Sequence, residues 1–139
     1  MPAHTHLNPP DIRPPFARYS HGVVVAPGAR LLFCSGQLGI APNDHVPTGV
    51  AEQTRLCFAN ISAVLTAAGM GRADIVRVNA YVAGREHLPA YMRARDQFLE
   101  GLAEPPASTL LLVAGFARPE FLVEVEVIAA APPGPDPAP

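Results

Sequence analysis

Cysteine and histidine are the first side chains to consider for metal binding or nucleophilic chemistry. The chain has two cysteines, Cys34 and Cys57, each inside an apolar stretch and without CxxC spacing. We interpret both as buried free thiols, because free cysteine packs as a small hydrophobe. Of the five histidines, only His4 and His6 are close in sequence, and they lie in a proline-rich segment. This spacing predicts no metal site.

Other catalytic motifs are missing from the sequence. There is no Gly-x-Ser-x-Gly elbow for a nucleophilic serine, and no glycine-rich loop for phosphate. The net charge of -2 does not favour nucleic-acid binding, which calls for a basic surface. No apolar run reaches the roughly 18 residues of a membrane span. The first residues lack the basic start and apolar run of a signal peptide, so we predict a cytoplasmic protein.

Proline marks both ends of the chain. Residues 1–15 hold five prolines and residues 131–139 hold five more. Because proline lacks a backbone donor, neither end is expected inside a sheet. We predict an N-terminal extension over 1–15, one domain over 16–130 and a disordered tail over 131–139.

The first half of the domain predicts two strands and a helix. Gly22–Val25 and Leu31–Gly36 are short apolar runs separated by a Pro-Gly turn, which predicts a hairpin. A helix is expected from Val50, with Thr48 as its N-cap and Gly69 at its end.

The second half of the domain predicts a strand, a helix and two further strands. Residues 74–83 predict a strand with Val76, Val78, Ala80 and Val82 on one face. A helix follows over Leu88–Gly101, then strands over Ser108–Val113 and Phe121–Ala130. The order β-β-α-β-α-β-β predicts an α+β fold whose sheet carries two helices on one face. The other face, which would include Tyr81 and Leu122, is partly apolar and predicts oligomerisation.

These elements carry an ordered set of short motifs that resembles the RidA (YjgF) family. The motifs are Ser35-Gly36-Gln37, Phe58-Ala59-Asn60-Ile61 with Ala67-Ala68-Gly69, Asp74-Ile75-Val76-Arg77, Pro106-Ala107, and Val123-Glu124-Val125-Glu126. The resemblance covers roughly residues 16–130. It implies a chorismate-mutase-like fold and a homotrimer with a central barrel and three pockets between subunits. It also implies hydrolysis of small enamines or imines to a carbonyl compound and ammonia, without a metal or organic cofactor.

The resemblance also assigns residues to the pocket. Tyr19 falls where the family places a pocket tyrosine, and Gly36 where the backbone approaches the ligand; a glycine permits that approach. Glu124 matches the glutamate that handles the hydrolytic water. A carboxylate can take a proton from attacking water and return one to the departing nitrogen.

The chain departs from the family at Ser108. The deaminases carry an arginine there, whose guanidinium grips the substrate carboxylate with two hydrogen bonds. A serine hydroxyl cannot make that contact, so activity on free 2-imino acids is doubtful. Ser108 and Thr109 together offer two hydroxyls for a neutral polar group. Arg118, in the loop before the last strand, is a candidate replacement cation.

Three functions remain open from the sequence. The first is hydrolysis of a small imine or enamine in an intersubunit pocket. The second is a non-catalytic trimer that binds a small metabolite or a partner protein, suggested by the absent arginine. The third, an enzyme of the chorismate mutase type, would need several pocket arginines, which this sequence does not place.

Overall fold

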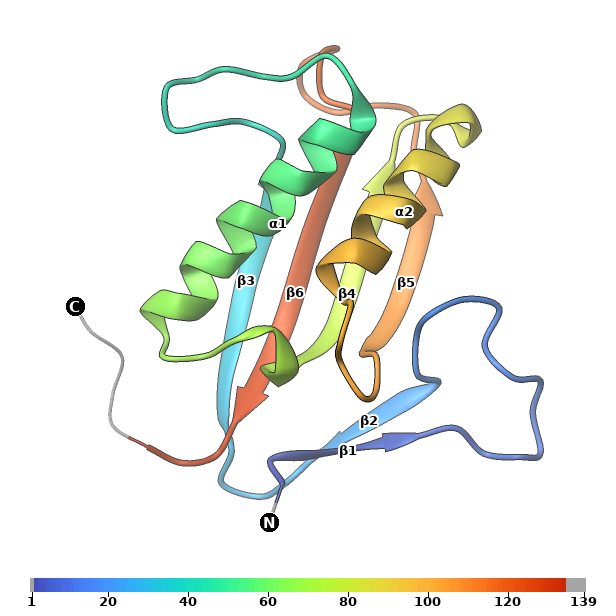
Figure 1. Ribbon diagram of the computed structural model, residues 1–139, viewed down its shortest axis with the longest axis vertical. Helices are drawn as coiled ribbons and strands as arrows, with labels where there is room; N and C mark the ends of the chain where they lie inside the picture. The colour runs from blue at the N-terminus through green and yellow to red at the C-terminus, as the bar shows by residue number, and fades with distance from the viewer. Residues whose placement is uncertain (1, 135–139) are drawn as a thin grey trace.

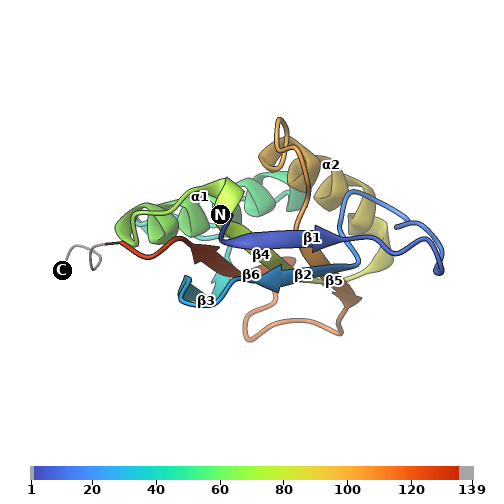
Figure 2. The ribbon, with the colours of Figure 1, turned by 90° about the horizontal axis from the view of Figure 1, so that it is seen from below.

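The computed structural model describes residues 2–134, which fold into two layers (Figure 1). The elements are β1 (His4–Leu7), β2 (Gly22–Val25), β3 (Arg30–Leu38), α1 (Val50–Ala67), β4 (Ile75–Val82), α2 (Leu88–Phe98), β5 (Ala107–Leu112) and β6 (Val123–Ala131). Short 3-10 turns at Arg72–Asp74 and Arg85–His87 lead into β4 and α2. Both helices lie on the same side of the strands, which leaves the opposite side of the sheet uncovered by helices (Figure 2). The predicted α+β class with two helices is confirmed.

A mixed four-stranded sheet forms the second layer. Its strand order is β3-β6-β4-β5, in which β4 and β5 run parallel and the other pairs are antiparallel. The central strand β6 places Glu124 opposite Tyr81 and Glu126 opposite Asn79 of β4. The last strand of the sequence therefore lies in the middle of the sheet.

The core lies between the sheet and the helices. Val123, Val125 and Val127 of β6 are at most 2% exposed, because alternate residues of a strand point to the same face. The helices contribute Ile61 and the stacked rings of Phe58 and Phe98, whose centroids are 4.3 Å apart. The alternate side chains of β6, Glu124, Glu126 and Ile128, point to the open face.

Helix α1 has a glycine at each boundary. Gly49 is the N-cap, with extended backbone angles, so the prediction of Thr48 as the cap is wrong by one residue. The Gly49 carbonyl accepts the Gln53 N–H, and no side chain caps this end. At the other end Gly69 has φ +70°, and Met70 N–H donates to the Leu65 carbonyl. This glycine-terminated cap satisfies carbonyls that the helix leaves free.

The predicted hairpin of the first two strands is wrong. β2 pairs with β1 of the N-terminal segment, residue Thr5 opposite Val24, and the two form a separate ribbon. β3 instead pairs along its length with β6. The chain does turn after Val25, as predicted, but a turn signal does not say which strand lies alongside.

Strand β4 begins with a bulge that changes its predicted faces. The register with β6 shifts between Ile75 and Arg77, which leaves Val76 as the extra residue. Ile75 packs in the core, whereas Val76 faces a hollow on the open side, so Val76 does not share a face with Val78 as predicted. A bulge redirects side chains in this way because two residues oppose one.

Other boundaries differ less from the prediction. Helix α2 ends at Phe98, before the predicted Gly101, and β6 extends one residue past the predicted domain limit to Ala131. The C-terminal tail is predicted to be disordered over residues 131–139. Of these, residues 135–139 lie outside the described part of the chain. Within residues 2–134 no helix is long and apolar enough to cross a membrane.

Candidate functional site

Glu124 and Gly36 meet on the open face of the sheet. A Cβ atom built on Gly36 would lie 2.5 Å from Glu124 Oε2 and 2.9 Å from its Cδ. No real side chain fits at that distance, so position 36 must be glycine for Glu124 to hold this position. The local cause is an irregularity in β3, whose register with β6 shifts between Cys34 and Gln37. Two of the predicted site residues are therefore brought together.

The two glutamates of β6 differ in their contacts. Glu126 Oε1 accepts hydrogen bonds from Tyr81 Oη at 2.6 Å and from Asn79 Nδ2 at 3.5 Å. Among residues 2–134, no side chain or backbone donor hydrogen-bonds to Glu124, and no cation lies within ion-pair distance of its carboxylate. Its oxygens are available to a water molecule or a ligand, whereas those of Glu126 are partly engaged.

Ser108 and Thr109 lie on the edge strand β5 and point in opposite directions. Ser108 is opposite Val78, a core residue, and so faces the helix layer. Thr109 Oγ1 accepts a 2.6 Å hydrogen bond from Arg77 Nη2 on the open face. Within one chain, Ser108 and Glu124 thus lie on opposite faces of the sheet and on strands separated by β4.

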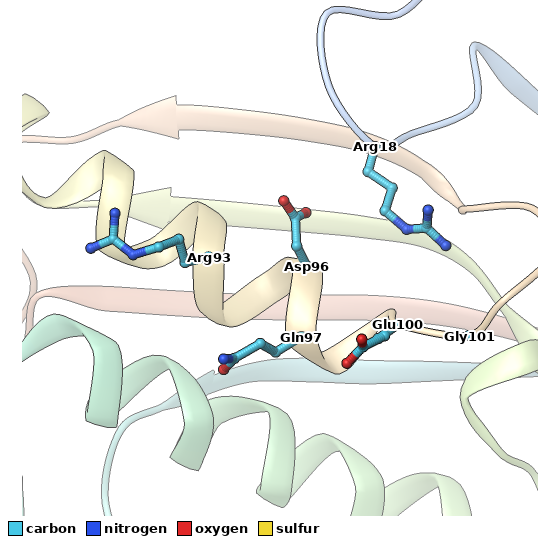
Figure 3. A pocket seen from close by; sticks show the side chains of 6 residues that line it. All are labelled: Arg18, Arg93, Asp96, Gln97, Glu100 and Gly101. Atoms are coloured by element: carbon cyan, nitrogen blue, oxygen red, sulfur yellow. The ribbon is translucent and has the colours of Figure 1, made fainter.

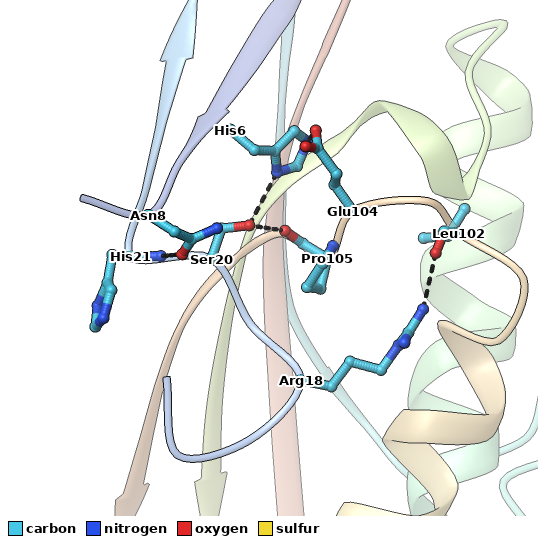
Figure 4. A network of polar contacts seen from close by, with 8 residues as sticks. All are labelled: His6, Asn8, Arg18, Ser20, His21, Leu102, Glu104 and Pro105. Atoms are coloured by element: carbon cyan, nitrogen blue, oxygen red, sulfur yellow. Dashed lines mark hydrogen bonds and ion pairs between the residues drawn. The ribbon is translucent and has the colours of Figure 1, made fainter. Parts of the chain in front are cut away.

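Tyr19 belongs to a segment that is anchored beside the start of β5. Ser20 N–H donates to the Pro106 carbonyl, and the buried Ser20 hydroxyl donates to the Pro105 carbonyl at 2.5 Å (Figure 4). Tyr19 itself is half-buried; its hydroxyl accepts the Phe16 N–H at 3.2 Å and its ring packs edge-on to His21. Tyr19 is therefore held near β5 and away from Gly36 and Glu124.

The same network brings a serine, a histidine and a glutamate together without making a nucleophile. His6 Nδ1 lies 3.1 Å from Ser20 Oγ, and His6 Nε2 lies 3.9 Å from Glu104. Because the Pro105 carbonyl can only accept, the Ser20 hydroxyl proton points at it, and Nδ1 of His6 must be the donor to Oγ. A serine that is 1% exposed and bonded in this direction cannot pass its proton to the histidine.

Arg118, the candidate replacement cation, and Arg18, which precedes Tyr19, both have other partners. Arg18 Nη2 donates to the Leu102 carbonyl at 2.8 Å, just beyond the end of α2, where a cation is favoured (Figure 4). Arg118 is half-exposed, lies 3.4 Å from Glu120 Oε1 and stacks over the Phe121 ring. Neither guanidinium reaches Glu124 within one chain.

A hollow of about 460 Å³ lies beside α2, away from the predicted residues (Figure 3). Its walls carry both signs of charge, from Arg18, Arg93, Asp96, Gln97, Glu100 and Gly101. In Figure 3 Arg93, Asp96, Gln97 and Glu100 spread along α2 and its end, and Arg18 comes from a separate segment, so the side chains do not converge on a point. Over the described part of the chain, no three His, Cys, Asp or Glu side chains gather as a metal site would require.

Sequence reasoning missed the polar row of β4. Arg77, Asn79 and Tyr81 alternate with core residues and all contact side chains of neighbouring strands on the open face. Asn79 Oδ1 is buried without a partner among the described residues. The alternation of β4 placed these residues on one face, but their partners on β5 and β6 depend on the strand order.

The profile of the endoribonuclease L-PSP family matches residues 11–131, nearly the whole described chain. The chain belongs to the RidA (YjgF) family. A RutC family protein of Saccharolobus solfataricus is 32% identical to this RidA family member over 117 residues, which cover 83% of this chain and 88% of the relative. TdcF of Escherichia coli carries the provisional name reactive intermediate deaminase. It is 28% identical over 101 residues, which cover 71% of this chain and 78% of TdcF.

Solved structures agree with this family assignment. The Rid family protein YyfB of Yersinia pestis superposes with a TM-score of 0.81 and 32% identity, covering 91% of this RidA family member and 98% of YyfB. The structure of Escherichia coli TdcF with bound serine has a TM-score of 0.68 at 26% identity, covering 83% and 89% of the two chains. The fold and the family are thus established together.

Proposed function

We propose that this RidA family member hydrolyses a small imine or enamine to a carbonyl compound and ammonia, with Glu124 as the acid–base group. The carrying observation is the unengaged Glu124 carboxylate held against Gly36 on the open sheet face. The serine bound in TdcF supports a small polar molecule as the kind of ligand.

The chemistry needs one group that moves protons. An enamine first tautomerises to the imine. Water then attacks the imine carbon while Glu124 takes a proton from it, and the nitrogen is protonated as the tetrahedral carbinolamine forms. Glu124 then takes the hydroxyl proton, the carbinolamine nitrogen gains a second proton from the carboxyl group, and cleavage of the C–N bond gives the carbonyl and releases ammonia. Imine hydrolysis has a low intrinsic barrier, so positioning and one carboxylate suffice.

The pocket, in this proposal, is completed by a second copy within a homotrimer. Glu124 and Gly36 would come from one subunit. Ser108 and Thr109 would come from the edge strand β5 of the next subunit, and Tyr19 from the segment beside that strand. This arrangement is supported by the positions of Ser108 and Glu124 on opposite faces of one sheet, which prevents them from sharing a pocket within a chain. Exposed apolar side chains on the open face, such as Phe33 at 70%, support burial by another subunit.

The substrate class follows from position 108. Because serine cannot form the two charge-assisted hydrogen bonds that an arginine makes to a substrate carboxylate, we propose a substrate that is neutral near the reacting carbon. Arg118 would assist only if it exchanged Glu120 for a ligand.

The test compares Glu124→Gln with Glu126→Gln, since both remove one carboxylate from the same face of β6. Ammonia release from a neutral imine and from 2-iminopropanoate is measured against the uncatalysed rate. Glu124→Gln should lose roughly 10²–10⁴-fold in rate, whereas Glu126→Gln should keep most of the activity. Ser108→Arg should raise the rate on the anionic imine alone by about ten- to a hundredfold.

Two outcomes would refute the proposal. One is that wild type and Glu124→Gln both follow the uncatalysed rate over a panel of imines; tight ligand retention without turnover would then favour the non-catalytic binding trimer. The other is equal loss of activity in both glutamine variants, because the assignment to Glu124 would then have no basis.

A further inference from the structure

Helix α1 packs on the two strands that carry Gly36 and Glu124 (Figure 1). Strand β3 is at the edge of the sheet and pairs with β6. The register of this pair shifts between Cys34 and Gln37, the segment that contains Gly36. Regular strand pairing is therefore interrupted where the two candidate site residues meet, and contacts from outside the ladder gain importance there.

The position of the Glu124 carboxylate depends on its backbone and on Gly36. Among residues 2–134 no group donates a hydrogen bond to this carboxylate. A Cβ atom on Gly36 would lie 2.5 Å from Glu124 Oε2 and 3.1 Å from Cγ, so the glutamate side chain packs directly on the β3 backbone. A small displacement of β3 relative to β6 would therefore move the carboxylate.

Asn60 of α1 holds the end of β3 that lies opposite Glu124. Its Nδ2 donates two long hydrogen bonds, to the Leu38 carbonyl at 3.4 Å and to the Ile40 carbonyl at 3.3 Å. Leu38 is the register partner of Glu124 in the ladder between β3 and β6. The amide of Asn60 thus fixes the residue directly across from the proposed acid–base group.

Gly39 brings this end of β3 against the helix backbone. It is buried, and a Cβ atom there would lie 2.5 Å from Gln53 Cβ and 2.6 Å from Gln53 Cα. Backbone atoms cannot move aside as the end of a flexible side chain can, so only glycine permits this approach. The close packing and the Asn60 hydrogen bonds act on the same three residues of the chain.

The same helix also holds the start of β6. Gln53 Oε1 accepts the Leu122 N–H at 2.9 Å, and Gln53 Nε2 donates to the Glu120 carbonyl at 2.8 Å. Positions 53 and 60 are separated by about two helical turns, so both side chains project from one face of α1. One face of this helix therefore fixes the backbone of both strands beside the Gly36–Glu124 contact.

We propose that Asn60 is a positioning residue for Glu124: by holding Leu38 from the helix side of the sheet, it keeps the Glu124 carboxylate against Gly36. Gln53 has the corresponding effect on β6. This inference rests on the proposed deaminase function for its effect on catalysis. Asn60 itself would not touch the substrate, because it belongs to the helix layer, whereas Glu124 points to the open face.

The test must separate positioning from a general loss of stability, and Thr54 supplies the matched control. Thr54 is fully buried in α1, and its hydroxyl donates to the Val50 carbonyl of the same helix at 2.7 Å. Thr54→Val keeps the shape of the side chain and removes this hydrogen bond. It therefore weakens the same helix without removing a hydrogen bond to β3 or β6.

The experiment compares Asn60→Asp with Thr54→Val in the full chain. Asn60→Asp keeps the shape of the side chain but replaces the donor NH₂ with an acceptor. With a neutral imine as substrate, its kcat for ammonia release should fall roughly ten- to a hundredfold, with KM changed by less than about twofold. The backbone amide NMR signal of Gly36 and the carboxyl carbon signal of Glu124 should both shift. Thr54→Val should leave kcat and both signals as in the wild type.

Two further variants keep the test decisive. Asn60→Leu lacks the donor without adding a charge, and should give the same result if Asn60→Asp does not fold. Gly39→Ala should push β3 away from α1 and shift the same two signals, whereas Gly49→Ala, where a Cβ meets nothing within 4 Å, should not.

The proposal is overturned if the folded Asn60 variants keep the wild-type signals of Gly36 and Glu124. It is also overturned if Thr54→Val lowers kcat as much as Asn60→Asp does, or if the signals shift while kcat stays unchanged. A wild type without turnover would refute the deaminase function instead; the NMR comparison would then still show whether Asn60 sets the position of Glu124.

Discussion

Tyr81 Oη donates a 2.6 Å hydrogen bond to Glu126 Oε1, across the two central strands of the sheet. Tyr81 is directly opposite Glu124 and therefore reaches diagonally to the next carboxylate on that face. This contact distinguishes the two glutamates of the Val-Glu-Val-Glu motif. Glu126 is paired within the chain, whereas Glu124 has no such hydrogen bond among residues 2–134.

The hydrogen bond to Glu126 raises the pKa of Tyr81 above its usual value, because ionising the phenol would lose the bond and place two negative charges together. Absorbance titration of the phenolate should show this pKa fall in Glu126→Gln. Since the folded pKa exceeds the unfolded one of about 10, this stabilisation is complete below that pH. It should be lost as the pH rises through the folded pKa. An unchanged titration in Glu126→Gln would contradict the assignment.

Gly36→Ala should displace the Glu124 carboxylate, because the new Cβ would meet Oε2 at 2.5 Å. We expect ammonia release to fall by at least tenfold while the thermal unfolding temperature changes little. Gly22→Ala, where a Cβ meets nothing within 4 Å, is the matched control and should keep full activity. Equal rates of ammonia release in the two variants would show that activity does not need a glycine at position 36.

Gln53 links three segments around the start of α1. It is fully buried, donates to the Pro47 and Glu120 carbonyls at 2.8 Å, and accepts the Leu122 N–H at 2.9 Å. Gln53→Met keeps the volume but loses these bonds, at about 1 kcal/mol each. Urea unfolding should show a loss of roughly 2–4 kcal/mol, and Gln97→Met on the exposed side of α2 should show almost none.

Both cysteines should react more slowly with a disulfide reagent than an exposed, reactive thiol does. Burial raises the pKa of Cys57 to about 12 and raises the pKa of Cys34 to a lesser extent. Because the thiolate is the nucleophile, both should label slowly with a disulfide reagent at pH 8 and quickly after unfolding. Cys57, which has no exposed surface, should label more slowly than Cys34, and rapid labelling of Cys57 in the native protein would contradict this prediction.

Much of the fold was predictable because it depends on local patterns. The alternation of apolar and charged residues in β6 distinguishes its buried valines from its outward glutamates, and the apolar spacing of α1 marks its core face. The pairing of β2 was not predictable, since a turn after Val25 is compatible with either neighbour. The bulge at Val76 was also missed, because an extra residue leaves no mark in a run of β-branched side chains.

The candidate site was also predictable only in part. Motifs in the sequence marked Gly36, Glu124 and Ser108, and the family they indicate is confirmed by the comparisons. The sequence does not show that Gly36 and Glu124 touch while Ser108 faces the opposite side, because these positions come from strands brought together only by the order β3-β6-β4-β5.

The sequence by itself therefore determined most of the elements after residue 21, the faces of most strands and the family, since hydrophobic periodicity and short motifs are properties of neighbouring residues. It did not predict β1. Only the tertiary structure decided which glutamate of β6 is hydrogen-bonded within the chain and which residues meet on the open face of the sheet. Those facts depend on contacts between residues far apart in the chain, such as Tyr81 with Glu126 and Arg77 with Thr109. Such contacts exist only once strand order and register have been set.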